Sequence, residues 1–228
     1  MDFDFDASKV DTLHAKGEFD DVFALVSGAY EGGNSKKNVE VIWRYARACF
    51  DRQEALDDKK EKEAFIRKGL KLADECIKHD NLHYSGHKWR AILLSELGNY
   101  TSLKEKIGNS FLIRDELDLS LKLQPGDTTT LLALGKWCQA VASVGWVQRK
   151  VAASLFAKPP EATYEEAIDF FRRAFEISPS KRSAFAIGEC YHDLKQKYLC
   201  QEWMQKCLDC PSASAVEQEL DAKAKTFL

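Results

Sequence analysis

Glycine and proline are scarce in this chain, with 12 Gly and 5 Pro among 228 residues. Because these residues mark turns, and because β-branched residues rarely alternate with polar ones, the sequence gives little support for strands. Apolar residues make up 45% of the chain and charged residues 30%, enough to bury a continuous core and unlike a disordered chain. We therefore expect a folded, all-α protein.

Long apolar runs are missing as well. No stretch of 18 apolar residues occurs, and the chain begins with alternating Asp and Phe instead of the basic start of a secretory signal. The sequence therefore predicts no transmembrane segment and a cytoplasmic protein. Seven cysteines are an odd number, so we expect reduced thiols and not a disulfide framework.

An excess of positive charge is also absent, since the net charge is −3. A nucleic-acid binder needs a clustered basic footprint, so we expect no nucleic-acid partner. The charge is nevertheless uneven along the chain. Residues 1–21 carry seven acids against two bases, whereas residues 59–71 carry six bases against two acids. The basic segment is therefore a candidate surface for an acidic partner.

Motifs that carry catalysis are not found. The sequence contains no Gly-rich phosphate loop, Ser nucleophile elbow or Rossmann fingerprint, so we expect no enzyme activity. Cysteines and one histidine do gather near the C-terminus (Cys190, His192, Cys200, Cys207 and Cys210), and Cys207 and Cys210 have ligand-like spacing. No second Cys-x-x-Cys accompanies them, so we predict no metal or other cofactor.

What the chain does contain is a repeated pattern of paired helices. The clearest unit has Leu131, Leu134, Gly135 and Cys138 on a first helix and Ala167, Phe171 and Ala174 on a second, followed by Pro179. Two helices approach closely where Gly or Ala removes bulk, so these small residues mark helix contacts. Comparable units occupy residues 41–81, 87–125 and 184–207, and the pattern resembles the tetratricopeptide repeat of 34 residues. It predicts a degenerate tetratricopeptide-like solenoid of helical hairpins.

The predicted organisation has two parts. Residues 1–31 read as a capping hairpin around Leu13 and Val22, and residues 32–228 as a single continuous repeat array after a linker-like Gly32–Lys37 stretch. Apolar residues recur at helical spacing from Leu131 to Leu155, which predicts one long helix through Phe156 that Pro159 and Pro160 end. Thr163 and Glu166 form a capping-box pattern for the next helix.

Several stretches resemble the regulator of microtubule dynamics family: residues 134–138, the segment through Trp146, Arg149 and Phe156, residues 162–179, residues 43–48 and residues 87–89. The similarity extends from about residue 10 to 210. It implies a tetratricopeptide-like protein without catalysis that associates with microtubules, the spindle and spindle poles and supports chromosome segregation. Some members carry an N-terminal membrane helix, act at organelle contacts and are connected with phospholipid binding. This sequence shows no such helix, which favours the cytoskeletal role.

Two candidate surfaces follow from the repeat. First helices line the concave face of such a stack, which selects as groove residues Trp43, Arg47, Lys88, Ile92, Leu132, Lys136, Phe185 and His192. The second surface is basic and would attract the acidic surface of tubulin; its residues are Lys59, Lys60, Lys62, Arg67, Lys68 and Lys71. The expected partner of these surfaces is tubulin or a spindle-associated protein. On a helix Lys60, Arg67, Lys68 and Lys71 would share one side. Ordinary packing and a solvated helix face are the alternatives.

Binding or transfer of phospholipid at organelle contacts is the alternative function. It requires an apolar cavity near the long predicted helix. The residues expected to line such a cavity are Trp146, Val147, Val151, Leu155 and Phe156.

Overall fold

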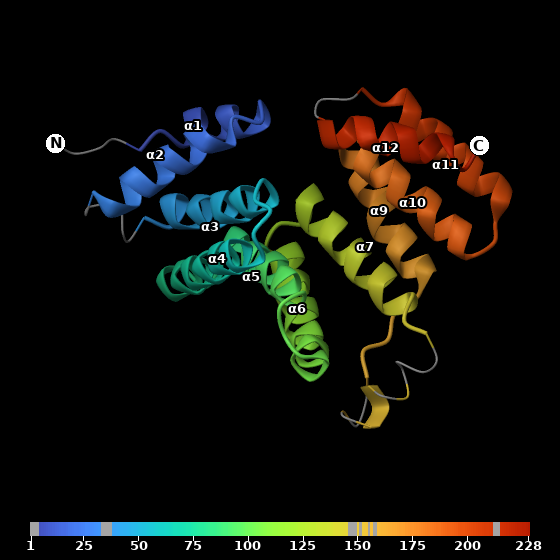
Figure 1. Ribbon diagram of the computed structural model, residues 1–228, viewed down its shortest axis with the longest axis horizontal. Helices are drawn as coiled ribbons and strands as arrows, with labels where there is room; N and C mark the ends of the chain where they lie inside the picture. The colour runs from blue at the N-terminus through green and yellow to red at the C-terminus, as the bar shows by residue number, and fades with distance from the viewer. Residues whose placement is uncertain are drawn as a thin grey trace. The chain divides into compact units, whose positions relative to one another are not determined.

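All regular structure in the described part of the chain is α-helical (Figure 1). The computed structural model describes residues 5–32, 38–145, 150, 152–154, 156, 159–211 and 215–228. The helices are α1 (Ala7–Ala15), α2 (Phe19–Glu31), α3 (Val39–Glu54), α4 (Lys59–His79), α5 (Tyr84–Leu97), α6 (Leu103–Leu123), α7 (Thr128–Ala142), α9 (Tyr164–Ile177), α10 (Lys181–Asp193), α11 (Lys197–Asp209) and α12 (Ala215–Lys225). The prediction of an all-α chain is confirmed.

The helices form two compact units, residues Met1–Leu123 and Gln124–Leu228, here called unit 1 and unit 2. In unit 1, α3 packs on α4 and α5 on α6; in unit 2, α7 packs on α9 and α10 on α11. These are the helix pairs that the repeat pattern predicts, so the tetratricopeptide-like hairpins are confirmed. The proposed division into a cap (1–31) and one array (32–228) stays a prediction, and linker residues 33–37 lie outside the described residues.

Polar side chains define where the helices begin. The Asp58 carboxylate accepts hydrogen bonds from the amides of Lys60 and Glu61 at the start of α4. Thr163 and Glu166 form the predicted capping box at the start of α9, each accepting a hydrogen bond from the other's backbone amide. Such caps satisfy amides that have no partner within the helix and typically stabilise it by about 1 kcal/mol.

Small residues of the repeat lie where the helices of a pair approach most closely. In unit 2 Gly135 of α7 faces the fully buried ring of Phe171 of α9. A Cβ atom at position 135 would lie 2.8 Å from Phe171 Cζ and closer still to two other ring carbons. Gly188 of α10 faces Met204 of α11 in the same manner. The absence of a side chain at these positions therefore sets the spacing of the hairpins.

This geometry predicts opposite effects for two Gly→Ala substitutions. Alanine favours a helix over glycine by up to about 1 kcal/mol, so Gly28→Ala in α2, where no atom lies within 4 Å of the new Cβ, should stabilise unit 1 by about that amount. Gly135→Ala should instead lower the free energy of unfolding of unit 2 by about 1–3 kcal/mol, because the Phe171 ring must move. Hydrogen exchange of each unit in the full chain measures both. Stabilisation by both substitutions would contradict the packing argument.

The long helix predicted from Leu131 to Phe156 is wrong. Helix α7 ends at Ala142, where the Ser143 hydroxyl donates a 2.8 Å hydrogen bond to the carbonyl oxygen of Ala140. Serine bonds readily to nearby backbone and Gly145 disfavours a helix, and both effects outweigh the apolar spacing on which the prediction relied. Trp146, Val147, Val151 and Leu155 lie outside the described residues, and Phe156 is half-buried.

The first two repeats are longer than 34 residues, and much of this extra length lies in the second helix of each hairpin. Both α4 and α6 have 21 residues, so residues beyond the 34-residue period lengthen helices in unit 1. The additional turns of α4 include Lys59 and Lys60, which places them on regular helix. No described helix combines the length and apolar composition that crossing a bilayer requires.

Candidate interaction surfaces

The groove candidates of unit 1 are packed against neighbouring side chains of the same unit. The Trp43 ring lies under two guanidinium groups, with Arg44 Cζ 4.2 Å and Arg47 Cζ 5.1 Å from its centroid, and it stacks on His83. Trp43, Arg47 and Lys88 are each more than nine-tenths buried, and Ile92 is half-buried. This face is therefore an aromatic and cationic cluster with little area open to a partner.

Carboxylates of the same unit neutralise these cations. Asp11 of α1 accepts hydrogen bonds from Arg44 Nη2 at 2.6 Å and from Arg47 Nη2 at 2.9 Å. Glu40 accepts hydrogen bonds from Arg44 and from Trp43 Nε1. Burial raises the pKa of Asp11, but the hydrogen bonds from Arg44 and Arg47 outweigh it, so the pKa lies below its usual value. An acidic partner would have to replace Asp11 to reach these arginines.

The groove candidates of unit 2 meet the C-terminal segment. Phe227 lies edge-on to Phe185, with centroids 6.2 Å apart, and edge-on to His192 at 5.0 Å. Phe185 is buried and His192 is exposed. On α7, Lys136 is exposed and Leu132 is half-buried. The assignment of this face of α7 and α10 to a partner groove stays a prediction, and the sequence gave no sign that the C-terminal segment contacts Phe185 and His192.

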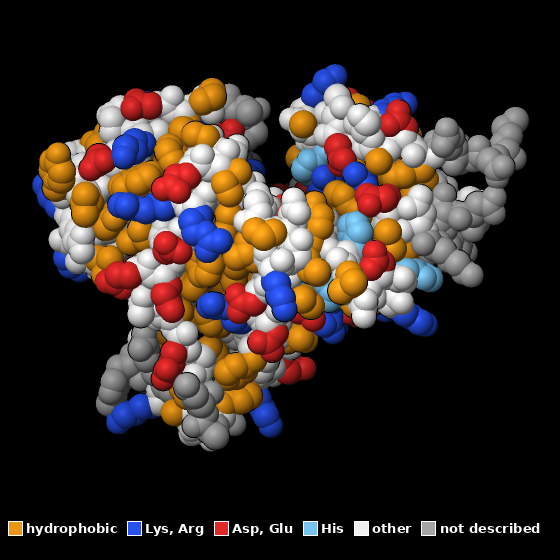
Figure 2. Space-filling model, turned by 180° about the vertical axis from the view of Figure 1, so that it is seen from behind, with side chains coloured by type: hydrophobic (Ala, Val, Ile, Leu, Met, Phe, Trp, Pro, Cys, Tyr) orange, Lys and Arg blue, Asp and Glu red, His pale blue; other side chains and the backbone are white. Residues whose placement is uncertain are grey.

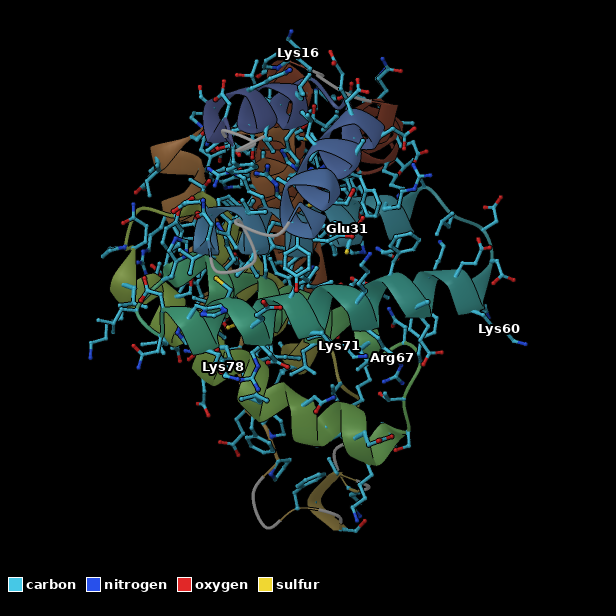
Figure 3. The ribbon with its side chains drawn as sticks, turned by 90° about the vertical axis from the view of Figure 1, so that its left-hand side faces the viewer. Lys16, Glu31, Lys60, Arg67, Lys71 and Lys78 are labelled. Atoms are coloured by element: carbon cyan, nitrogen blue, oxygen red, sulfur yellow. The ribbon has the colours of Figure 1, made fainter. Side chains whose placement is uncertain are left out.

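The basic surface lies on α4, which is a second helix of a hairpin. Four exposed cations, Lys60, Arg67, Lys71 and Lys78, succeed one another along its length (Figure 3). At 100° per residue their positions fall within about 20° of one line, and they extend over about 27 Å. We call these four residues the α4 stripe. Lys78 extends the basic segment recognised from the sequence by two turns.

Three lysines of the predicted patch point away from this line. The Lys68 amino group donates a hydrogen bond to Tyr45 Oη and lies 4.6 Å from the centroid of the Tyr45 ring. Its charge thus faces the aromatic residues between α2 and α4. Lys59 is exposed and Lys62 half-buried, and helical geometry places both on other sides of α4. Helix geometry therefore divides the predicted patch, and its role in binding tubulin stays a prediction.

Two acids beside the stripe are each paired with an arginine, one outside the stripe and one within it. Asp74 forms an ion pair with Arg90, with 2.8 Å between a carboxylate oxygen and Nε. Glu63 forms an ion pair of 2.7 Å with Arg67, four residues later on α4. Within the described ranges no carboxylate lies within 4.0 Å of the amino groups of Lys60, Lys71 or Lys78. Elsewhere, on the face drawn in Figure 2, acidic and basic side chains are interspersed among hydrophobic ones. The stripe is thus a line of three unpaired lysines and one partly neutralised arginine.

The cysteines behave as buried packing residues. Burial raises the pKa of the Cys49, Cys76 and Cys190 thiols to about 12, which keeps them protonated at neutral pH. Cys200 and Cys207 are buried as well, at the small-residue positions of α11. Over the part of the chain that the structure describes, no group of three or more His, Cys, Asp or Glu side chains is arranged to hold a metal ion.

An open groove of about 390 Å³ on unit 2 was not expected from the sequence. Its lining combines acidic, basic and apolar residues: Glu165, Ile168, Asp169, Arg172, Tyr191, Leu194, Gln196 and Leu199. Arg172 Nη2 donates a 2.7 Å hydrogen bond to Tyr191 Oη, which ties the walls of the groove together. The mixed lining gives no preference for one class of ligand.

Two buried ionic contacts also escaped the sequence analysis. His87 Nδ1 lies 2.6 Å from the Glu116 carboxylate in unit 1, and the Lys181 amino group lies 2.6 Å from Asp221 in unit 2. His87 and Lys181 occupy positions next to or within the first-helix repeat pattern, where an apolar or neutral residue is usual. The position of His87 at the start of a predicted repeat unit was a signal for the first contact, whereas Lys181 precedes its unit and gave none.

Solved structures similar to this chain share its fold. A tetratricopeptide-repeat protein of Thermus thermophilus has a TM-score of 0.69 at 12% identity, covering 96% of this chain and 95% of its own. The MamA protein of Desulfovibrio magneticus has a TM-score of 0.52 at 10% identity, covering 89% of this chain and 90% of its own. These likenesses confirm the tetratricopeptide-like architecture.

Sequence comparison identifies the family. Regulator of microtubule dynamics protein 1 of Pongo abelii is 30% identical over 223 residues, covering 96% of this chain and 70% of its own. Regulator of microtubule dynamics protein 3 of Xenopus laevis is 31% identical over 182 residues, covering 79% and 39%. The family described as regulator of microtubule dynamics protein 1-3 matches residues 6–228. The chain belongs to the regulator of microtubule dynamics protein family.

Proposed function

We propose that this protein is a non-catalytic microtubule-associated protein that binds the acidic surface of tubulin through the α4 stripe. The observation that supports this most is the line of unpaired lysines on an exposed helix of a protein whose net charge is −3. The names of its relatives as regulators of microtubule dynamics agree with such a role. On spindle microtubules and at spindle poles the same attachment would support chromosome segregation.

The stripe is a better candidate for tubulin than the groove of unit 1. Buried cations of that groove already have Asp11 and Glu40 as partners, so a new anion would have to compete with them. The lysines of the stripe are exposed and unpaired, so an acidic surface can approach them with only a small desolvation cost. Their regular spacing over about 27 Å lets several charges act together on an extended acidic partner. The phospholipid alternative and the remaining groove residues stay predictions.

Reversal of the stripe should remove microtubule binding. We expect the full chain carrying Lys60→Glu, Arg67→Glu, Lys71→Glu and Lys78→Glu to bind polymerised tubulin at least about tenfold more weakly than the wild type at 0.15 M salt. Co-sedimentation over a range of salt concentrations measures this. Wild-type binding should weaken as salt rises, because exposed charges are screened over about 8 Å at that ionic strength.

A second variant separates the stripe from net charge. Its four reversed cations are also exposed but scattered: Lys122, Arg182, Lys197 and Lys225, each replaced by Glu. It has the same net charge as the stripe variant and should retain most of the binding. Equal losses in both variants would mean that only total charge matters, and undiminished binding of the stripe variant would rule out the stripe. Circular dichroism confirms that each variant is folded.

A further inference from the structure

The C-terminal helix α12 lies on unit 2 through three residues spaced three apart. Asp221 accepts a 2.6 Å hydrogen bond from the Lys181 amino group, Ala224 is fully buried, and Phe227 packs on Phe185 and His192. The contacts join α12 to α10 and α11. Phe227 therefore occupies the part of the first-helix face that a groove ligand of unit 2 would contact.

Among the described side chains of α12, few are buried. The helix has 11 residues, and of its described apolar side chains Ala224 is fully buried whereas Leu220 is half-buried. Phe227, just beyond its end, is half-buried too. By comparison α10 buries nine residues. A helix of this length is only marginally stable alone, so its attachment depends on tertiary contacts, which for the described residues at this end of the chain include a 2.8 Å hydrogen bond from Gln201 Nε2 to the carbonyl oxygen of Leu228.

If α12 were released, the ionisable groups that it covers, Lys181 and Glu189, would keep other hydrogen-bond partners. The Lys181 amino group also donates to the carbonyl oxygens of Cys207, at 2.9 Å, and of Leu208, at 3.4 Å. Burial raises the pKa of Glu189, which lies near Lys223 and is hydrogen-bonded to Gln139 of α7. Neither group depends on α12 alone. A buried charge left unpaired is a main obstacle to displacing an element, and here that obstacle is small.

The contacts of α12 and Phe227 also indicate which side chains this face of unit 2 can bind. The Lys181 amino group selects an acidic side chain, the close approach to α10 and α11 selects a small one, and the Phe185 ring selects an aromatic one. We propose that this face of unit 2 is a docking surface for an amphipathic partner helix with acidic, small and aromatic residues at successive three-residue intervals, and that α12 is its displaceable intramolecular occupant. This docking surface is separate from the α4 stripe.

The test uses the full chain and a fluorescein-labelled peptide of residues 215–228. Wild-type chain should bind the peptide weakly, because its own α12 competes at high effective concentration. Phe227→Ala in the chain weakens that competitor, so the variant should bind the wild-type peptide at least about tenfold more tightly, as measured by fluorescence anisotropy. Chain with Lys225→Ala, an exposed position of α12, is the matched control and should behave as wild type.

Two further measurements locate the binding. A peptide with Phe227→Ala should lose at least about tenfold in affinity for the Phe227→Ala chain, since one buried aromatic contact is missing. His192→Ala should be added to that chain, because His192 is exposed whereas Phe185 is buried. The double variant should bind the wild-type peptide more weakly than the Phe227→Ala chain does. Equal affinities of the wild-type and Phe227→Ala chains, no binding by any variant, or binding that His192→Ala leaves unchanged would each overturn the proposal.

Discussion

Glu116→Ala is expected to lower the free energy of unfolding of unit 1 by about 3 kcal/mol, because it leaves the buried His87 without its carboxylate, whereas the half-buried Arg90 keeps its ion pair with Asp74. The Glu116 side chain is 12% exposed; it lies 2.6 Å from His87 Nδ1, and Arg90 Nη1 donates to it at 2.5 Å. Asp118→Ala on the same helix is the control, since Asp118 is 48% exposed and pairs with Arg114 four residues earlier on the helix surface. We expect that change to cost about 0.5 kcal/mol or less.

The pH dependence of stability provides a second measurement on the same variant. His87 faces an acceptor at both ring nitrogens, since Nε2 lies 2.9 Å from the carbonyl oxygen of Asn81. The hydrogen bond to Glu116 raises the pKa of His87 above its ordinary 6.5 although burial opposes this. Because protonated His87 is favoured in the folded state, it contributes fully to stability below about pH 6.5. This contribution to the free energy of unfolding is lost as pH rises through the higher folded-state pKa.

Glu116 adds the opposite dependence in acid. Burial raises its pKa, but the hydrogen bond from His87 and the charge of Arg90 outweigh it, so the pKa lies below the ordinary 4.5. This contribution is present above about pH 4.5 and lost as pH falls through the folded-state value. Unit 1 should thus lose stability above pH 6.5, and Glu116→Ala should flatten that slope. Hydrogen exchange of α5 amides in the full chain between pH 6 and 9 measures it; an unchanged slope in the variant would contradict the assignment to His87.

Asp11→Ala should destabilise unit 1 by about 2–4 kcal/mol, and Asp221→Ala should destabilise unit 2 by no more than about half as much. Asp11 is the acceptor for two guanidinium groups whose side chains are 8% and 10% exposed. Arg47 has no other carboxylate in hydrogen-bond contact among the described residues, and its Nε already lacks a partner. Removing Asp11 therefore leaves a buried charge unsatisfied, although the 42% exposure of Asp11 lets water enter and moderates the loss.

Asp221 differs because its partner has other acceptors. Lys181 keeps the carbonyl oxygens of Cys207 and Leu208 when the carboxylate is removed. Hydrogen exchange of the amides of each unit, at increasing denaturant concentration, measures the free energy of unfolding of both variants. A loss for Asp221→Ala as large as that for Asp11→Ala would show that α12 is an integral part of unit 2 and would also weaken the case for its displacement.

The repeat pattern alone determined much of the fold. Leu131, Leu134, Gly135 and Cys138 are all buried on α7, and Ala167, Phe171 and Ala174 are all buried on α9, as the pattern predicted. Such positions are readable because packing between neighbouring helices depends on side-chain size at fixed intervals along one helix. The same reasoning failed after Ala142, where the local preferences of Ser143 and Gly145 end the helix although apolar spacing continues.

The sequence predicted only some of the features of the candidate interaction surfaces. The basic composition of residues 59–71 pointed to α4, yet helix phase and the contact with Tyr45 separated Lys68 from the stripe and added Lys78 to it. Trp43, Arg47 and Phe185, which the sequence predicted to line a groove, are buried, and their role in binding a partner stays a prediction.

Residues distant in the sequence decide that burial. Asp11 reaches Arg47 across 36 positions, and Phe227 meets Phe185 across a still longer separation. Sequence periodicity records which side of a helix a residue occupies, because that depends only on neighbouring turns. It contains no information on which distant segment folds over that side. The sequence by itself therefore determined the hairpins and their contact residues, and only tertiary structure decided which faces remain open.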